Sequence, residues 1–369
     1  MNIKIAWIVG VIVIVVIIWA ISAGSNNTKK ASDTVTIGVS LPLTGSLAFA
    51  GEGYRMGLVA AQKKVESEGG INGKKIEFVI EDNVYDPKLS ISTFEKLRSA
   101  KSDIYIITGS VPTSAVSPIA EKAGVPVLVS MSFSDTQSKF QNQASFYPTA
   151  TEDITATVKT MVANKVSKVA VVYLNSDYGQ AMMKAFREQA ASKGINIVYE
   201  DTFLGSDTNF QTQLSKTIAS KPQAIFVVAI NSLPVVKQLK TFKSGIAIYT
   251  NNPATSGSLI YKDKDAFEGV YATAFKTTIP GTPEFARIRA EVGTSSPNDS
   301  FGYAAAGYDN LMAIAAVLKK NPNANEFVKT FSSYGSFTGI NGTFELNSRD
   351  VSIPLYPVVF KGGVLSEVK

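Results

Sequence analysis

Small polar residues gather directly after several short apolar runs of this sequence, where the ends of parallel strands would lie. In open parallel sheets, ligands bind beyond the carboxyl ends of the strands, where the free N–H groups of the following helices face them. The first half supplies hydroxyl groups there, which suit a carboxylate, and the second half supplies a ring, amides and one acid. Taken singly, each residue is also a common cap or turn residue, but together they predict a ligand cleft. The candidates are Gly45 to Gly53, Thr113, Ser114, Ser132, Ser134, Asp177, Tyr178, Asn231, Ser232, Asn251 and Asn252.

The composition removes most catalytic chemistry. The 369 residues include no His and no Cys. Catalysis by Ser-His-Asp or Cys-His, zinc sites with N and S ligands, and disulfides are therefore excluded. An enzyme would have to rely on carboxylates, Lys, Tyr and Ser. We expect no enzyme, no metal site and no cofactor.

Nucleotide chemistry and nucleic-acid binding are disfavoured as well. Gly51 to Gly53 before a helix, with Glu81 and Asp82 after the second strand, loosely imitates a dinucleotide fingerprint. However, the first strand ends near Leu41, well before these glycines, and no GxxxxGK phosphate loop occurs. The formal net charge is +6, and part of it comes from Lys residues at positions 4, 29 and 30. The remaining charge is too mild for a nucleic-acid partner.

The elements that would position the polar residues follow a repeated order of strand, helix and strand. Val35 to Leu41 predicts a strand, the apolar spacing from Tyr54 to Val65 predicts a helix, and Lys75 to Glu81 predicts the next strand. The same order begins again near Ile104, Val169 and Ala224. Short buried strands that alternate with helices form parallel sheets, so we expect an α/β protein of two doubly wound, Rossmann-like lobes. An internal pseudo-repeat supports two lobes, because 68–72 is similar to 193–196 and 110–112 to 232–234.

The N-terminal residues 5–23 form an uncharged apolar run with Trp7 and Trp19 near its ends. Its length suits one transmembrane helix, and a cleaved signal peptide, whose apolar region spans about 7–15 residues, is the alternative. Ser25 stands where a bacterial lipoprotein would carry its lipidated Cys, so lipidation at that site is excluded. We expect 1–24 to be a membrane anchor or uncleaved signal, and 25–34 to be a polar tether.

Over nearly the whole range from Val35 to about Phe360, the chain resembles the branched-chain amino acid binding proteins, which are type I periplasmic solute-binding proteins of ABC importers. The run from Glu68 to Ile76 is the most specific match, whereas the separate glycines are weak matches. The other matching segments are 37–45, Gly51, Gly57, 81–82 with 86–87, 124–126, 177–179 with Phe186, 221–222, 268–270 and 304–309.

The resemblance implies two lobes that are joined by a three-strand hinge and close on a small molecule. We place the crossovers near Pro148 to Thr151, Ala274 to Thr277 and Tyr334 to Gly339. The first lobe would then comprise 35–148 and 277–335, and the second lobe 149–276 and 336–369.

Carried over by position, the resemblance assigns roles to several candidates. The family's carboxylate clamp falls on Thr113, Ser132 and Ser134, and the ring that covers the ligand from the second lobe falls on Tyr178. Phe49 is the nearest match to the family's aromatic residue in the first loop.

The sequence departs from the family at the acid that pairs with the ligand ammonium. That position falls on Asn252 or on its neighbour Asn251, and an amide carries no charge. An unpaired buried ammonium costs several kcal/mol, so an unmodified α-amino acid is disfavoured as the ligand unless Asp177 substitutes.

These observations predict a monomeric, membrane-anchored, extracytoplasmic protein without catalytic activity. It would deliver a small polar molecule, such as an amino acid or a related carboxylate or amide, to an ABC importer permease. The alternative is a ligand-sensing ectodomain that signals to a membrane partner.

Overall fold

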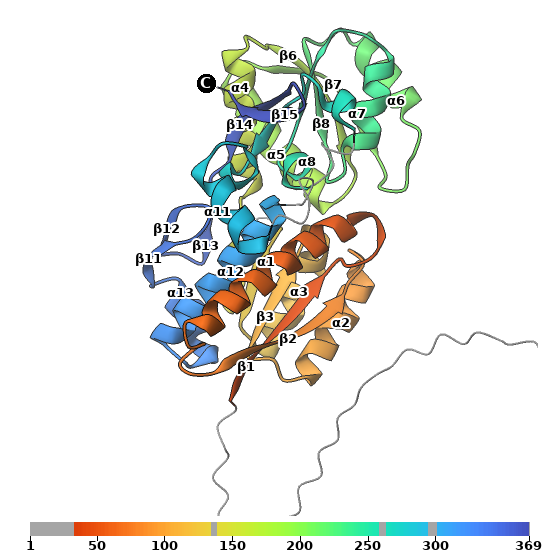
Figure 1. The fold of residues 1–369 in the computed structure, drawn as a ribbon. Coiled ribbons are helices and arrows are strands. Elements are labelled where there is room, and N and C mark those ends of the chain that lie inside the picture. Colours follow the sequence, from red (N-terminus) through yellow and green to blue (C-terminus); the bar gives the residue numbers. More distant parts are fainter. Residues whose placement is uncertain (1–32, 134–138, 258–262, 294–300, 369) are drawn as a thin grey trace, which may run out of the picture. The chain divides into compact units, whose positions relative to one another are not determined.

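Each of the two lobes is built on one sheet that is parallel over most of its width (Figure 1). The computed structural model describes residues 33–133, 139–257, 263–293 and 301–368. The first sheet is parallel throughout, and its central strands are buried on both faces, which explains their continuous apolar sequence. In spatial order it contains β13 (Asp350–Val351), β5 (Gln143–Phe146), β4 (Val127–Ser130), β3 (Ile104–Thr108), β1 (Thr34–Leu41) and β2 (Lys75–Asp82).

The second sheet has a parallel core and an antiparallel edge, because β14 runs antiparallel to both of its neighbours. In spatial order it contains β15 (Val364–Glu367), β14 (Tyr356–Lys361), β10 (Tyr271–Ala274), β9 (Ala247–Thr250), β8 (Ala224–Val228), β6 (Lys168–Leu174) and β7 (Asn196–Phe203). Its helices are α4 (Ala150–Ala163), α5 (Asp177–Ser192), α6 (Gln211–Ala219), α7 (Leu233–Thr241), α8 (Pro253–Ser256) and α10 (Lys264–Phe267).

Two long helices, α1 (Ala48–Ser67) and α12 (Phe301–Lys320), lie side by side in the first lobe (Figure 1). Gly57 of α1 and Gly307 of α12 allow this approach. A Cβ on Gly57 would overlap the carbonyl oxygen of Ala304, and a Cβ on Gly307 would overlap that of Tyr54. The buried Tyr54 hydroxyl also donates to Asn310 Oδ1 at 2.6 Å. The two glycines therefore allow the backbones of α1 and α12 to touch, and this contact sets the distance between the two helices.

The opposite face of the first sheet is covered by α2 (Pro87–Ser99) and α3 (Ser110–Ala123). Phe94 and Leu97 of α2 and Val116 of α3 pack on Tyr105 and Ile107 of β3. Helices thus cover both faces, as the strand-helix alternation predicts. The lobe is completed by α11 (Pro283–Val292), α13 (Phe327–Phe331), the hairpin β11 (Gly335–Thr338) and β12 (Thr343–Leu346), and three single-turn 3-10 helices at Gly45–Leu47, Lys276–Thr278 and Ala324–Glu326.

The third passage between the lobes lies later in the chain than expected. The assignment of 336–369 to the second lobe is wrong for its first part, because β13 pairs with β5 in the first sheet. The hairpin also packs there, since Phe337 and Phe344 contact the ring of Phe146 at centroid distances of 5.9 and 5.0 Å. The buried Asp309 carboxylate of α12 accepts from the N–H of Ile340 at 2.6 Å. The chain therefore passes to the second sheet between β13 and β14.

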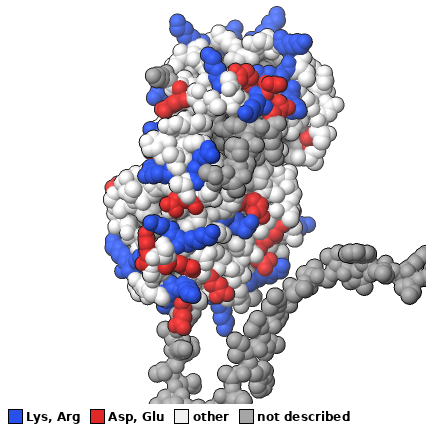
Figure 2. Space-filling view, in the orientation of Figure 1, with Lys and Arg blue, Asp and Glu red and all other residues white. Residues whose placement is uncertain are grey.

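On the face seen in Figure 2, basic and acidic side chains are interspersed over both lobes. Several of them form exposed ion pairs, such as Arg98 with Glu95 and Arg187 with Glu200. Within residues 33–368, as far as they are described, no helix combines the length and hydropathy that a bilayer crossing requires. The apolar run 5–23 lies outside the described residues.

We expect Gly57→Ala and Gly307→Ala each to lower the free energy of unfolding by roughly 1–3 kcal/mol, because an added methyl group would force α1 and α12 apart. Gly205→Ala is the matched control, since its added Cβ would meet only the Leu174 side chain, at 3.8 Å. Urea denaturation of residues 32–369, followed by circular dichroism, measures the difference. Equal stability of all three variants would contradict the proposed role of this helix contact.

Candidate functional site

A small pocket lies where the carboxyl ends of the two sheets face each other, and we call it the interlobe pocket. Its volume is about 30 Å³, which is room for about one water molecule. None of the described residues that line it is charged. They are Pro42, Leu47, Ala50, Tyr85, Gly109, Met131, Phe133, Tyr147 and Tyr303 from the first lobe and its crossover, and Tyr178, Ile230 and Pro253 from the second lobe.

Aromatic rings form much of the wall of the interlobe pocket. Phe133 meets Tyr147 and Tyr178 edge to face, with centroid distances of 5.4 Å in both pairs. Burial raises the pKa of Tyr147 and of Tyr178 well above its usual value, so both phenols stay protonated. The pocket is therefore apolar, with neutral hydroxyl groups as its polar points.

The first turn of α3 borders this pocket. Gly109 precedes the helix with a φ of 91°, a conformation that side chains disfavour, and so turns the chain from β3 into α3. Thr113 is fully buried, and its hydroxyl finds no hydrogen-bond partner among the described residues. Ser132, which follows β4, is also buried. The N–H groups at a helix start favour an anion, and the unpartnered Thr113 hydroxyl adds a donor there.

Tyr85 occupies this helix start. Its ring lies against Gly109, where an added Cβ would approach the Tyr85 Cε2 atom to 2.5 Å. The Tyr85 oxygen faces the backbone N–H groups of Val111 and Ser110 and the Ser110 hydroxyl. Its pKa is raised, first because the phenol is removed from water and also because the Asp177 charge lies near it.

The second lobe has amide and hydroxyl groups directly after β8 and β9, although none of these residues lines the interlobe pocket. Asn231 Oδ1, Ser232 Oγ and Asn252 Nδ2 are buried atoms without a hydrogen-bond partner in the described part of the chain. Asn251, in contrast, is used within the lobe, because its Oδ1 accepts from the N–H of Ala229 at 3.2 Å and its amide donates to the Tyr178 hydroxyl. Asn251 therefore orients Tyr178, whereas the other three have spare bonding capacity.

A buried acid, Asp153 of α4, lies behind these residues. Its carboxylate accepts from the N–H of Asn252 at 3.1 Å and from the hydroxyl of Thr273. Burial raises its pKa to about 6, although both hydrogen bonds oppose the shift. Its charge contributes to the raised pKa of Tyr178. Asp153 is therefore near the pocket but bound to its own lobe.

Of the expected site residues that the structure describes, only Tyr178 and two residues within 45–53, Leu47 and Ala50, line the interlobe pocket itself. Asp177 is exposed in the first turn of α5 and does not line the interlobe pocket. Phe49 packs between the lobes, against Gly257 and with its ring 6.0 Å from the Tyr303 centroid. Ser114 is partly buried on α3. Ser134 lies outside the described residues.

Sequence reasoning missed several pocket residues. Phe133 stands between two expected site residues, and Tyr85 stands before the Asp86-Pro87 start of α2, so both positions were in view. Among the expected residues, only Phe49 and Tyr178 carry rings, and most of the others carry hydroxyl or amide groups. Tyr147 and Tyr303 come from a crossover and from α12, and no local pattern connects them with the strand ends.

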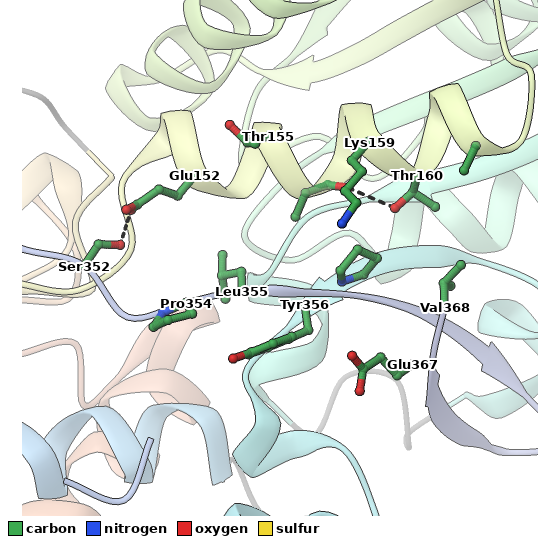
Figure 3. A pocket seen from close by; sticks show the side chains of 13 residues that line it. Glu152, Thr155, Lys159, Thr160, Ser352, Pro354, Leu355, Tyr356, Glu367 and Val368 are labelled. Carbon is green, nitrogen blue, oxygen red and sulfur yellow. Dashed lines mark hydrogen bonds between the residues drawn. The ribbon is translucent and has the colours of Figure 1, made fainter. Parts of the chain in front are cut away.

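A separate surface groove of about 620 Å³ lies on the second lobe (Figure 3). It runs between α4 and the passage from β13 to β14, and the Ser352 hydroxyl donates to Glu152 at one end. Glu152 already caps α4 by accepting from the Thr149 N–H at 2.9 Å. The groove holds no buried unpartnered side chain among the described residues, so we do not assign the ligand to it. Nor do the described residues contain a group of three or more acids placed to hold a metal ion.

Comparison with known proteins gives a consistent result. The sequence profile of a family described as periplasmic binding protein matches residues 34–358. An amino acid binding protein of Pseudomonas aeruginosa is 25% identical over 64% of this chain and 67% of its own length. The leucine-, isoleucine-, valine-, threonine-, and alanine-binding protein of the same organism is 23% identical over 55% of this chain and 56% of its own length. The chain thus spans about half to two thirds of these curated relatives.

Solved structures show the same fold. The branched-chain amino acid substrate-binding protein LivJ of Streptococcus pneumoniae, in complex with isoleucine, superposes with a TM-score of 0.82 at 23% identity, covering 90% of this chain and 98% of LivJ. A solute-binding protein of an ABC transporter from R. palustris, in complex with benzoate, has a TM-score of 0.81 at 20% identity, covering 91% of this chain and 95% of that protein.

We expect Asp153→Asn to change how stability depends on pH. The folded-state pKa of about 6 lies above the usual 3.8, so the wild type loses stability from this group as pH rises from about 4 to 6. The variant lacks this loss, so its unfolding free energy relative to the wild type should increase by roughly 2–3 kcal/mol from pH 4 to pH 7. Urea denaturation at both pH values measures this, with the exposed Asp265→Asn as control. A difference that does not vary with pH would show that Asp153 titrates normally.

Proposed function

The chain belongs to the periplasmic binding protein family, and we propose that it captures a small carboxylate in the interlobe pocket and delivers it to an ABC importer. Support comes from the match over residues 34–358 and from the pocket itself, which tyrosines of the first lobe and its crossover line together with Tyr178 of the second lobe. The family's location implies an extracytoplasmic protein. In this proposal the chain binds its ligand and catalyses no reaction, and the apolar run 5–23 anchors it to the membrane.

The proposed ligand is a carboxylate with a flat, apolar body. The observation that carries this proposal is the uncharged aromatic wall of the pocket beside the free hydroxyl of Thr113 at the start of α3. Thr113 and Ser132 would bind the carboxylate with the N–H groups of α3, since charge-assisted hydrogen bonds of this kind are strong. Ser134, which lies outside the described residues, would be the third hydroxyl of this carboxylate clamp.

An α-ammonium group has no evident partner in this arrangement. Asn252 does not line the pocket, and its unpartnered amide nitrogen is a donor, which repels another donor. Asp153 is already engaged by Asn252 and Thr273, and Asp177 is exposed. Leaving a buried ammonium unpaired costs several kcal/mol. A ring without an ammonium fits better, and the benzoate-bound R. palustris protein with a similar fold supports this choice.

Closure of the two lobes would bury such a ligand. The pocket has walls from both lobes, and its present volume of about 30 Å³ is far below the roughly 300–1,000 Å³ of typical ligand sites. Entry therefore requires the lobes to separate at the crossovers. Tyr178 would contact the ligand from the second lobe, chiefly in the closed state, with Asn231 and Ser232 beside it. In this proposal the other two crossovers lie near Pro148 to Thr151 and near Ala274 to Thr277, as the sequence predicts.

We expect benzoate to bind at least about tenfold more tightly than leucine, because only leucine brings an ammonium that must be desolvated without an anionic partner. Isothermal titration calorimetry on residues 32–369 measures both affinities, and benzamide, which lacks the anion, is the control for the carboxylate. Tighter binding of leucine would mean that an acid reaches the ligand, and would overturn the proposed ligand class.

We expect Thr113→Val to weaken benzoate binding by about 10- to 150-fold, because it removes one hydrogen bond to a charged oxygen, worth roughly 1.5–3 kcal/mol. Thr155→Val, an exposed position in the surface groove, is the matched control. The same calorimetric titration provides the comparison. Unchanged affinity of the Thr113 variant would place the carboxylate elsewhere.

A further inference from the structure

The side chain of Tyr85 fills the place where the proposed ligand would present its anion. It lines the interlobe pocket, lies across Gly109, and directs its oxygen toward the N–H groups of Ser110 and Val111. In the same helical turn, the buried Thr113 hydroxyl has no partner among the described residues. The start of α3 therefore presents more donors than the one phenol oxygen can use.

The turn that carries Tyr85 is built to hold this conformation. Val84 and Tyr85 both adopt positive φ values, 51° and 61°, each of which costs about 1–2 kcal/mol for residues with side chains. Side chains offset this cost, because Asp82 accepts from the Val84 N–H at 2.9 Å and Asn83 accepts from the Tyr85 N–H at 2.8 Å. The buried Asn83 also donates to Ser40 Oγ at 3.0 Å. The loop is thus anchored to β1 and aims Tyr85 into the pocket.

Tyr85 and a ligand cannot share the pocket. The volume that remains beside the Tyr85 ring is about 30 Å³. This is room for about one water molecule and is too little for a ligand with a ring. A bound carboxylate would also need the N–H groups that the Tyr85 oxygen faces. Hydrogen bonding therefore requires the phenol to leave, and once the lobes have closed the volume requires it as well.

We propose that Tyr85 is an internal competitor of the ligand, and that it selects ligands in which a flat ring carries an oxygen anion. This inference rests on the proposed function. The phenol is itself a ring with an oxygen, and it lines the pocket together with three other tyrosines, Tyr147, Tyr178 and Tyr303. A neutral or apolar ligand gains no more from the N–H groups of α3 than the phenol does. A carboxylate or phenolate gains more, because hydrogen bonds to an ionised acceptor are roughly twice as strong as neutral ones.

Removal of the competitor should therefore increase affinity. The apparent dissociation constant is the intrinsic one divided by the fraction of molecules in which Tyr85 is out of the way. Tyr85→Phe keeps the ring but loses the oxygen, and Tyr85→Ala removes both. With benzoate and 4-hydroxybenzoate as probes, we expect binding to tighten about three- to tenfold in Tyr85→Phe and by at least as much in Tyr85→Ala.

The experiment is calorimetric titration of the full chain in detergent micelles, with Tyr199→Ala on β7 as the control that should match the wild type. Thermal unfolding of each variant confirms that it is folded. Unchanged or weaker binding by both Tyr85 variants, while the wild type binds, overturns the competition but leaves the proposed function standing. If neither probe binds to the wild type or to either variant, both the competition and the proposed ligand class are wrong.

Discussion

The backbone N–H groups at the start of α3 must find acceptors inside a pocket walled by aromatic rings. A buried donor without an acceptor costs about 1–3 kcal/mol, so this helix start cannot stay unpaired in the closed cleft. Gly109 makes the helix start accessible by its positive φ, and Tyr85 directs its oxygen toward it. Thr113 adds a hydroxyl with no partner in the described chain. Which acceptor occupies this place determines both the state of the cleft and the ligands that can enter.

The second lobe binds two of its own polar side chains, Asn251 and Asp153, before it meets a ligand. Asn251 is held by Ala229 and Tyr178, and Asp153 is held by Asn252 and Thr273. This layer orients the Tyr178 ring and uses the one buried acid near the pocket. As a result, the second lobe offers rings and neutral amide atoms rather than charge. The two lobes thus have different roles in ligand binding. The first lobe provides hydrogen-bond donors for an anion, and the second lobe provides an apolar cover.

Much of the fold could be predicted from the sequence because strand and helix periods are local properties. The alternation of apolar runs and helical spacing correctly indicated parallel sheets covered by helices, and Thr113 and Tyr178 lie in the first turns of the helices that follow β3 and β6. The third crossover was misplaced because the alternating pattern around Phe337 and Phe344 suits a hairpin on either lobe. Only the contact with Phe146 and the pairing of β13 with β5 decide between them.

The sequence by itself determined the α/β fold class and the absence of His and Cys chemistry. These follow from residue types and from spacing along the chain. Only the tertiary structure decided that Tyr85 turns into the pocket, that Asp153 lies behind Tyr178, and that Asp177 faces solvent. Those outcomes depend on how side chains from distant segments share volume and hydrogen bonds. A local sequence pattern does not reveal such competition. Each residue could keep its preferred backbone conformation in several different arrangements of the side chains.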